Sequence, residues 1–144
     1  MRSILAAILL ATLAACSMVG LGDDKVLEAT EAGVFTNGAL SMAGTGIPLE
    51  KGLTFGMRFK YLGTKAGPVK ATITVHTPGL INPDRNAVEL EYVSKLTLSP
   101  GQSYDAFFTF SRKWEMASGH WTIVVETEKG DTLTMLFDAY EITR

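Results

Sequence analysis

Apolar and polar residues alternate along most of the chain after residue 25, which is typical of half-buried antiparallel strands. The clearest run is LTFGMRFKY at residues 53–61, and Val88, Leu90 and Tyr92 likewise alternate with two glutamates. Turn residues separate the runs, and no window keeps a helical period. The pattern predicts strands at about 26–36, 40–47, 53–62, 69–76, 88–98, 104–110, 120–127 and 132–142.

Seven to eight short strands with this spacing predict an all-β domain, a single immunoglobulin-like antiparallel β-sandwich. A small β-barrel is the alternative architecture. The last hairpin can be predicted to its register, because residues 128–130 (EKG) form a three-residue turn. That turn pairs Thr127 with Asp131 and gathers the apolar residues of both strands on one face. It also places His120 opposite Asp138 on the outer face.

Some residues on the predicted outer faces are apolar or charged in a way that indicates contact with another part of the protein. Four of them are apolar: Val93, Phe107, Val124 and Leu136. We expect the first strands to cover these four, with a patch that binds a partner as the alternative. Arg58 also faces outward, and we expect it to pair across strands with Glu89 or Glu91.

Successive antiparallel strands reverse direction, so alternate loops share an end of the sandwich. One end, which we call the long-loop end, gathers residues 48–52, 77–87 and 111–119. The other, the short-turn end, gathers residues 63–67, 99–103 and 128–131. Long loops on a rigid scaffold commonly carry binding sites. The candidate binding residues lie in the two longest loops: Arg85, Arg112, Lys113, Trp114 and Glu115.

These loop residues also have plainer interpretations. We favour Trp114 as a lid over the end of the sandwich rather than a ligand platform, and Arg112 and Lys113 as solvated charges. The segment 40–47 decides how this end is oriented. If it is a full strand, the chain enters at the long-loop end; if it is a loop, the chain enters at the short-turn end.

The first fifteen residues, MRSILAAILLATLAA, differ from the rest of the chain in composition. A cationic start, an apolar run at residues 4–13 and a small-residue end form the arrangement of a secretory signal peptide. As a helix the apolar run would reach roughly 15 Å, about half of a bilayer core, so it is too short to span a membrane.

Residues 13–16, LAAC, resemble the lipobox of bacterial lipoproteins. The resemblance implies cleavage between Ala15 and Cys16 and attachment of diacylglycerol and an acyl chain to Cys16. Two or three chains anchor a protein stably, whereas one does not. Ser17, rather than Asp, follows the cysteine, which by resemblance favours the outer membrane, facing the periplasm. An ordinary secretory signal is the alternative.

Charge and cysteine content narrow the function further. The 144 residues contain 13 Lys and Arg against 15 Asp and Glu, so no basic surface is available for nucleic acid. The single cysteine excludes an internal disulfide framework and a cysteine metal cluster. We expect a removed signal peptide at 1–15, a lipidated tether at 16–24 and one sandwich domain at 25–144.

Several short patterns occur in order along the chain. They are Glu31-x-Gly33-x-Phe35, Ile47-Pro48 with Gly52, Phe55-Gly56-x-Arg58-Phe59, and Trp114-Glu115 followed by Gly119-x-Trp121. The set resembles a bacterial family known as domain of unknown function 3859. The resemblance implies one compact β-domain in exported or envelope proteins and implies no reaction. The chain departs from the family pattern at His76-Thr77-Pro78, where a His-Pro pair is expected.

Catalytic motifs are missing from the sequence: there is no serine elbow, zinc-protease motif or phosphate loop. His76 and His120, with Asp138 or Asp84, have the chemistry for a metal site. We favour ordinary surface pairs, and expect no catalytic residue, metal or cofactor.

The expected function is a non-catalytic module on the membrane that binds an envelope protein. The alternative is a small-molecule or glycan-binding lipoprotein that uses Trp114, Arg112 and Lys113. A hydrolase or metal enzyme, which would need one of the histidines, ranks third.

Overall fold

The computed structural model describes residues 25–63 and 67–142. The predicted signal peptide, the predicted lipidation site at Cys16, the predicted tether and part of the predicted 63–67 turn lie outside the described residues. No helix within the described ranges is long and apolar enough to cross a membrane. The elements are β1 (Leu27–Thr36), β2 (Ala39–Ala43), β3 (Gly46–Pro48), β4 (Thr54–Tyr61), β5 (Val69–Asn82), β6 (Ala87–Leu98), β7 (Ser103–Thr109), η1 (Lys113–Glu115), β8 (Gly119–Thr127) and β9 (Thr132–Tyr140).

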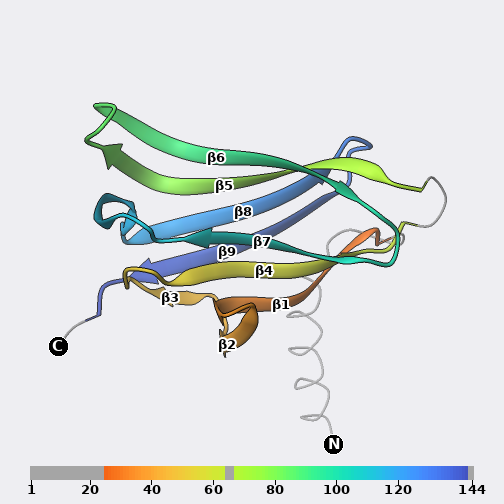
Figure 1. Ribbon diagram of the computed structural model, residues 1–144, viewed down its shortest axis with the longest axis horizontal. Helices are drawn as coiled ribbons and strands as arrows, with labels where there is room; N and C mark the ends of the chain where they lie inside the picture. The colour runs from red at the N-terminus through yellow and green to blue at the C-terminus, as the bar shows by residue number, and fades with distance from the viewer. Residues whose placement is uncertain (1–24, 64–66, 143–144) are drawn as a thin grey trace, which may run out of the picture.

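The strands form two sheets that lie face to face (Figure 1). Sheet A has the order β2-β1-β4-β7, and sheet B has the order β3-β9-β8-β5-β6. All strand pairs are antiparallel except β3 with β9. The predicted sandwich is therefore confirmed. The barrel alternative is wrong, because both sheets are open and end in edge strands.

Aromatic rings join the two sheets in the core. Phe55 of sheet A lies with its ring centroid 5.6 Å from that of Trp121 and 5.3 Å from that of Phe137, both in sheet B. All three side chains are fully buried. Edge-to-face pairs of this kind add about 0.5–1.5 kcal/mol each to the gain from burial. The contact fixes how the sheets stack.

The register of the last hairpin is the predicted one. Thr127 donates its backbone N–H to the carbonyl of Asp131 at 2.9 Å, which closes the three-residue turn. Trp121 pairs with Phe137, and His120 pairs with Asp138 and contacts its carboxylate. The alternation of apolar residues was sufficient here because a slip of one residue would have placed the apolar set in water.

The segment 40–47 is not one strand, contrary to the prediction. Its first part is β2, on the edge of sheet A, and its last part is β3, on the edge of sheet B. Gly44, with φ +127°, lies between them and allows the chain to turn from one sheet to the other. Since β1 pairs Leu27 with Tyr61 at the end of β4, the chain enters the domain at the short-turn end.

Arg58 does not pair with Glu89 or Glu91, because those residues belong to β6 in the other sheet. Its guanidinium group instead holds the strands on either side of β4. Nε donates to Asp105 on β7 at 2.7 Å, and Nη1 donates to Glu31 on β1 at 2.9 Å. The hydrogen bond with Asp105 is the main cause that raises the pKa of Arg58 above its ordinary value.

The first strands were expected to cover four apolar residues on the outer faces. This prediction is correct for Phe107 and wrong for Val93 and Leu136. Phe107 is partly buried under Phe35 of β1, with ring centroids 4.3 Å apart. Val93 and Leu136 are 53% and 60% exposed, because β1 and β2 extend sheet A instead of lying over sheet B. Val124, on a central strand of sheet B, is partly exposed.

Gly56 on β4 supplies a test of the packing between strands. Its φ is +152°, and a Cβ atom there would lie 2.1 Å from the carbonyl oxygen of Ala106. Gly56→Ala should lower the free energy of unfolding by about 2–5 kcal/mol through backbone strain and overpacking. Gly46→Ala is the control, since its Cβ would only touch Tyr140 at 3.6 Å. Urea midpoints that shift equally for both variants would contradict this.

Candidate functional site

The segments grouped at the long-loop end do meet there (Figure 1). Phe110 donates to the carbonyl of Leu53 at 3.0 Å and accepts from Gly52 at 2.7 Å, which joins the connection before β4 to the end of β7. A Cβ atom on Gly119 would lie 3.2 Å from the Cβ atom of Pro78, so the loop before β8 also touches β5. The three segments therefore form one surface.

Residues 77–87, predicted as a loop, are mostly strand. β5 continues to Asn82 and β6 begins at Ala87, so the two form a long hairpin. A bulge between His76 and Leu80 interrupts the pairing without ending it. The prolines and glycine of this segment indicated a loop, but a bulge tolerates such residues within a strand.

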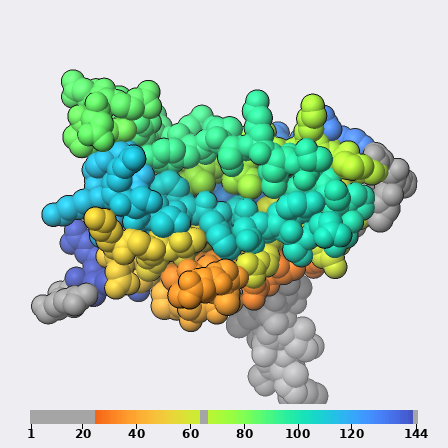
Figure 2. All heavy atoms as spheres, viewed as in Figure 1, coloured from red at the N-terminus to blue at the C-terminus, as the bar shows by residue number. Residues whose placement is uncertain are grey.

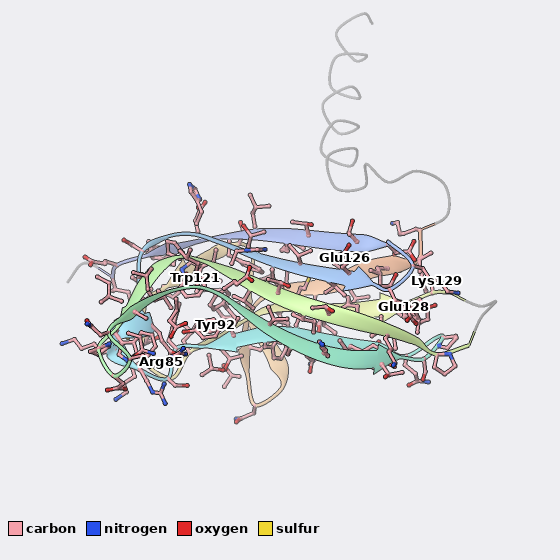
Figure 3. The ribbon with its side chains drawn as sticks, turned by 90° about the horizontal axis from the view of Figure 1, so that it is seen from above. Arg85, Tyr92, Trp121, Glu126, Glu128 and Lys129 are labelled. Atoms are coloured by element: carbon pink, nitrogen blue, oxygen red, sulfur yellow. The ribbon has the colours of Figure 1, made fainter. Side chains whose placement is uncertain are left out.

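A small hydrogen-bond network shapes the hairpin tip. Asn82 accepts the backbone N–H of Asp84 at 2.9 Å through its side-chain oxygen. Its amide nitrogen donates to Glu89 at 3.0 Å, and Arg85 donates to the same carboxylate oxygen at 3.4 Å. Arg85 is a highly exposed side chain, so this ion pair adds little stability. Figure 3 shows Arg85 at the same end of the sandwich as Tyr92 and Trp121.

Three large apolar side chains are exposed on one face of this hairpin. Ile81 is 71% exposed, Val88 is 59% exposed and Leu90 is 63% exposed. Ile81 pairs directly with Val88, and Leu90 lies two residues further along the same strand, so the three share a face. We call these three residues the hairpin face. Figure 2 shows the hairpin tip, in green, standing out from the body of the molecule.

From the alternation of apolar and polar residues, Val88 and Leu90 were expected to pack inside the sandwich. Tyr92, on the same side of β6, does pack there, with its ring centroid 5.2 Å from that of Phe108 in sheet A. Val88 and Leu90 lie further toward the tip, where no described residue covers them. The strand period was therefore correct, but it carries no information on where the facing sheet ends.

Partly buried hydrogen bonds hold the loop at 111–119. One carboxylate oxygen of Glu115 accepts the backbone N–H groups of Ser111 at 2.8 Å and Arg112 at 2.9 Å. Trp121 donates its ring N–H to the carbonyl of Ala117 at 3.0 Å. Glu115 is buried, so it serves the loop's own conformation and is not presented to a ligand.

The other candidates in this loop lie close together on its surface. The guanidinium carbon of Arg112 lies 5.8 Å from the centre of the Trp114 ring, within the range of a cation–π contact. Trp114 is partly buried and packs against the core, which agrees with its interpretation as a lid. Lys113 is exposed beside an open hollow of about 390 Å³. Among the described residues, Arg85 forms a hydrogen bond and ion pair with Glu89 and none with these three.

Tyr92 is a polar feature that the sequence did not indicate. Its hydroxyl oxygen is buried and has no hydrogen-bond partner among the described residues. Burial raises the pKa of Tyr92, and the negative charges of Glu115 and Glu89 raise it further, while Arg112 acts in the opposite direction. No local pattern of residues could have shown this, because two of these charged neighbours, Glu115 and Arg112, come from a loop that is distant in sequence.

Titratable side chains within 25–63 and 67–142 form no group of three or more that could hold a metal ion. The two histidines each have one acidic neighbour on the outer face of sheet B. His76 lies 3.6 Å from Glu91, and His120 contacts Asp138. All four side chains are well exposed, so these are surface pairs of the kind that the sequence favoured.

The fold is that of an immunoglobulin-like domain. The chain is similar to an immunoglobulin-like protein from Pseudomonas aeruginosa, with a TM-score of 0.68 and 24% identity, over 83% of this chain and all of the other. The family model described as Domain of unknown function (DUF3859) matches residues 23–137. The protein therefore belongs to this family.

Other solved structures are less similar. A β-glucosidase from Listeria innocua has a TM-score of 0.40 and 16% identity, over 85% of this chain but only 18% of the enzyme. A sporulation control protein from Bacillus subtilis has a TM-score of 0.43 and 11% identity, over 86% of this chain and 51% of the other. No curated protein matches the sequence. The family description and the immunoglobulin-like protein name no reaction.

Tyr92→Phe should raise the free energy of unfolding by about 1 kcal/mol, because it removes a buried hydroxyl without a partner. Since the pKa of Tyr92 is raised above 10.0 in the folded chain, the folded state holds this proton more tightly than the unfolded state. Relative to the ionised form, the protonated hydroxyl therefore favours the folded state. This part of the folding free energy is present below pH 10 and is lost as pH rises through the folded pKa. The variant should therefore lose part of the decline in stability at high pH.

Tyr104→Phe is the matched control for that substitution. The Tyr104 oxygen accepts the backbone N–H of Ser99 at 2.6 Å, so its loss should lower stability by about 1 kcal/mol. Denaturant titrations of both variants at pH 7 and above pH 10 make the comparison. The account of Tyr92 would be wrong if both variants were destabilised equally at pH 7.

Proposed function

We propose that this protein is a lipid-anchored lipoprotein of the bacterial cell envelope whose domain binds another protein through the hairpin face. The membrane part of the proposal rests on the signal sequence and on Cys16 within the LAAC motif. The binding part rests on one observation: Ile81, Val88 and Leu90 are each more than half exposed on one face of a projecting hairpin. Contiguous apolar surface with a polar rim is typical of protein interaction sites.

A protein suits this surface better than a small ligand does. Small molecules bind in concave sites that enclose most of their surface. The tip of the β5–β6 hairpin projects from the body (Figure 2), and the nearby hollow at Lys113 is open. The glycan alternative needs the ring of Trp114, but Arg112 lies over that ring and the core packs against it. The family and the immunoglobulin-like relative suggest no chemistry, and the proposed role is non-catalytic.

The position of β1 indicates that the hairpin face lies at the end of the domain away from the anchoring bilayer. β1 begins beside Tyr61, at the short-turn end, while the hairpin face lies at the other end. Nine residues of β8 correspond to about 30 Å of strand between the two ends. With Cys16 in the outer membrane, the hairpin face would be directed into the periplasm and toward another envelope protein.

Cross-linking in intact cells, followed by affinity purification and mass spectrometry, tests this function. The full chain should enrich one dominant envelope protein, and Ile81→Asp should reduce its recovery at least about tenfold because a charge replaces a central apolar contact. Leu136→Asp is the matched control, since Leu136 is 60% exposed on the outer face of sheet B. Cys16→Ser tests whether the anchor creates the contact.

Two results would overturn this function. One is equal loss of the captured protein with Ile81→Asp and Leu136→Asp, which would mean that the hairpin face is not specific. The other is the absence of any enriched protein with the full chain, which would favour the small-ligand alternative. Equal recovery by Cys16→Ser and the full chain would refute the role of the anchor alone.

A further inference from the structure

The outer edge of β6 is the longest free strand edge of the described sandwich. β6 has twelve residues and pairs with β5 only, whereas the other edge strands β2, β3 and β7 have five, three and seven. An edge strand presents unpaired backbone N–H and C=O groups, which form a template for another strand. The length of β6 gives such a strand a large area of contact.

This edge lacks most of the features that prevent pairing. Its sequence, AVELEYVSKLTL, has no proline, and its register with β5 is unbroken from Leu98 to Glu91. Lys95 is the one basic residue of the strand, and Leu90 and Val93 are 63% and 53% exposed. Natural edge strands are commonly protected by proline, bulges, several lysines or short length.

We infer that two copies of this chain pair antiparallel through β6, about a two-fold axis at Val93. The axis runs perpendicular to the sheet, so each sheet B continues into that of the second copy. The interface is isologous, with the same strand on both sides, as in most symmetric dimers. Strand addition at a free edge is a common mode of protein association.

Charge complementarity selects this register. With the axis at Val93, Glu91 lies opposite Lys95 of the second copy, and the two-fold symmetry forms this pair twice. An axis at Tyr92 would place Glu91 opposite Val93, and an axis at Ser94 would place it opposite Thr97. Opposite charges that face each other across strands stabilise the pairing, whereas like charges oppose it. Val93 also lies near the middle of β6, so nearly the whole strand is paired.

The side chains on the other face of β6 fit the same register. Leu90 lies opposite Leu96 of the second copy, and Val88 lies opposite Leu98. Leu90 and Val88 are largely exposed in the single chain, whereas Leu96 is partly buried and Leu98 fully buried. Leu90 therefore gains an apolar neighbour that still has exposed surface, which stabilises the pair by the burial of apolar surface, whereas Leu98 has none left to bury.

The charged residues are available for this contact. Lys95 forms no ion pair within the described residues, and the one such contact of Glu91 there is with the imidazole of His76, at 3.6 Å. Both Glu91 and Lys95 are exposed. The pairing uses Val88 and Leu90, two of the three residues of the hairpin face, whereas Ile81 lies on β5, outside the paired strand. It does not require the proposed function, because the backbone edge and the Glu91–Lys95 pair exist whether or not another protein binds.

A disulfide between copies tests the axis. Val93→Cys in the full chain, expressed in intact cells with a mild oxidant, should form a covalent dimer with twice the mass of the single chain from the same cells. Residues directly opposite in an antiparallel pair have Cβ atoms about 4.5–5.5 Å apart, close enough for a disulfide after small shifts. Leu136→Cys, on the same face but on β9, should form at least about tenfold less dimer.

Charge exchange tests the register. In the Val93→Cys chain, Glu91→Lys or Lys95→Glu should lower the dimer yield roughly three- to tenfold, because each places two like-charged pairs across the axis. The combined Glu91→Lys/Lys95→Glu chain should restore the yield, since the pairs are exchanged and not lost. Both positions are exposed, so the folded domain should tolerate each substitution.

Three outcomes would overturn the inference: equal dimer yields from Val93→Cys and Leu136→Cys, single charge variants without effect, or a double variant that is not restored. The outcome of the disulfide experiment can be distinguished from the outcome of the capture experiment that tests the proposed function. A dimer that captures no other protein supports the pairing and overturns the function. A captured envelope protein with no Val93→Cys dimer does the reverse.

Discussion

The contact between Phe55 and Trp121 is the constraint on which the sandwich and its long-loop end both depend. It joins the central strand β4 of sheet A to the central strand β8 of sheet B. Trp121 also donates its ring N–H to the carbonyl of Ala117, so the same ring holds the loop at 111–119. Within that loop, the Glu115 carboxylate accepts two backbone N–H groups. The surface at this end is therefore fixed to the core, and only the tip of the β5–β6 hairpin extends beyond that support.

The residues that carry the family resemblance serve mainly the scaffold. Gly33 and Gly56 lie opposite each other where neighbouring strands approach closely, and a side chain at either would meet backbone atoms. Arg58 joins the strands on both sides of β4, and Phe55 and Trp121 fill the core. Shared motifs of this kind indicate a shared fold, and they leave the exposed residues of the hairpin free to differ in function.

Local pattern predicted most strands and the register of β8 with β9, because both follow from which residues must leave water. It failed where the partner is distant in sequence. Arg58 was assigned to glutamates on β6, since alternation shows that a residue faces outward but not which strands lie beside it. At 77–87, prolines and a glycine suggested a loop, whereas the bulge after His76 accommodates them. The candidate loop residues were brought to one end as predicted, but the exposed hairpin face was not foreseen, because no local pattern marks where a facing sheet ends.

The parallel pair of β3 with β9 has a consequence for how the chain folds. Gly46 pairs with Asp138, so an edge of sheet B joins the early part of the domain to its last strand. Contacts this far apart in sequence slow folding, since a long loop must close before they form. β3 can reach its native partner only once the chain has been synthesised as far as β9, the last strand of the domain. Until then β1, β2 and β4 can associate while sheet B stays incomplete, so the apolar face of these strands stays exposed to water.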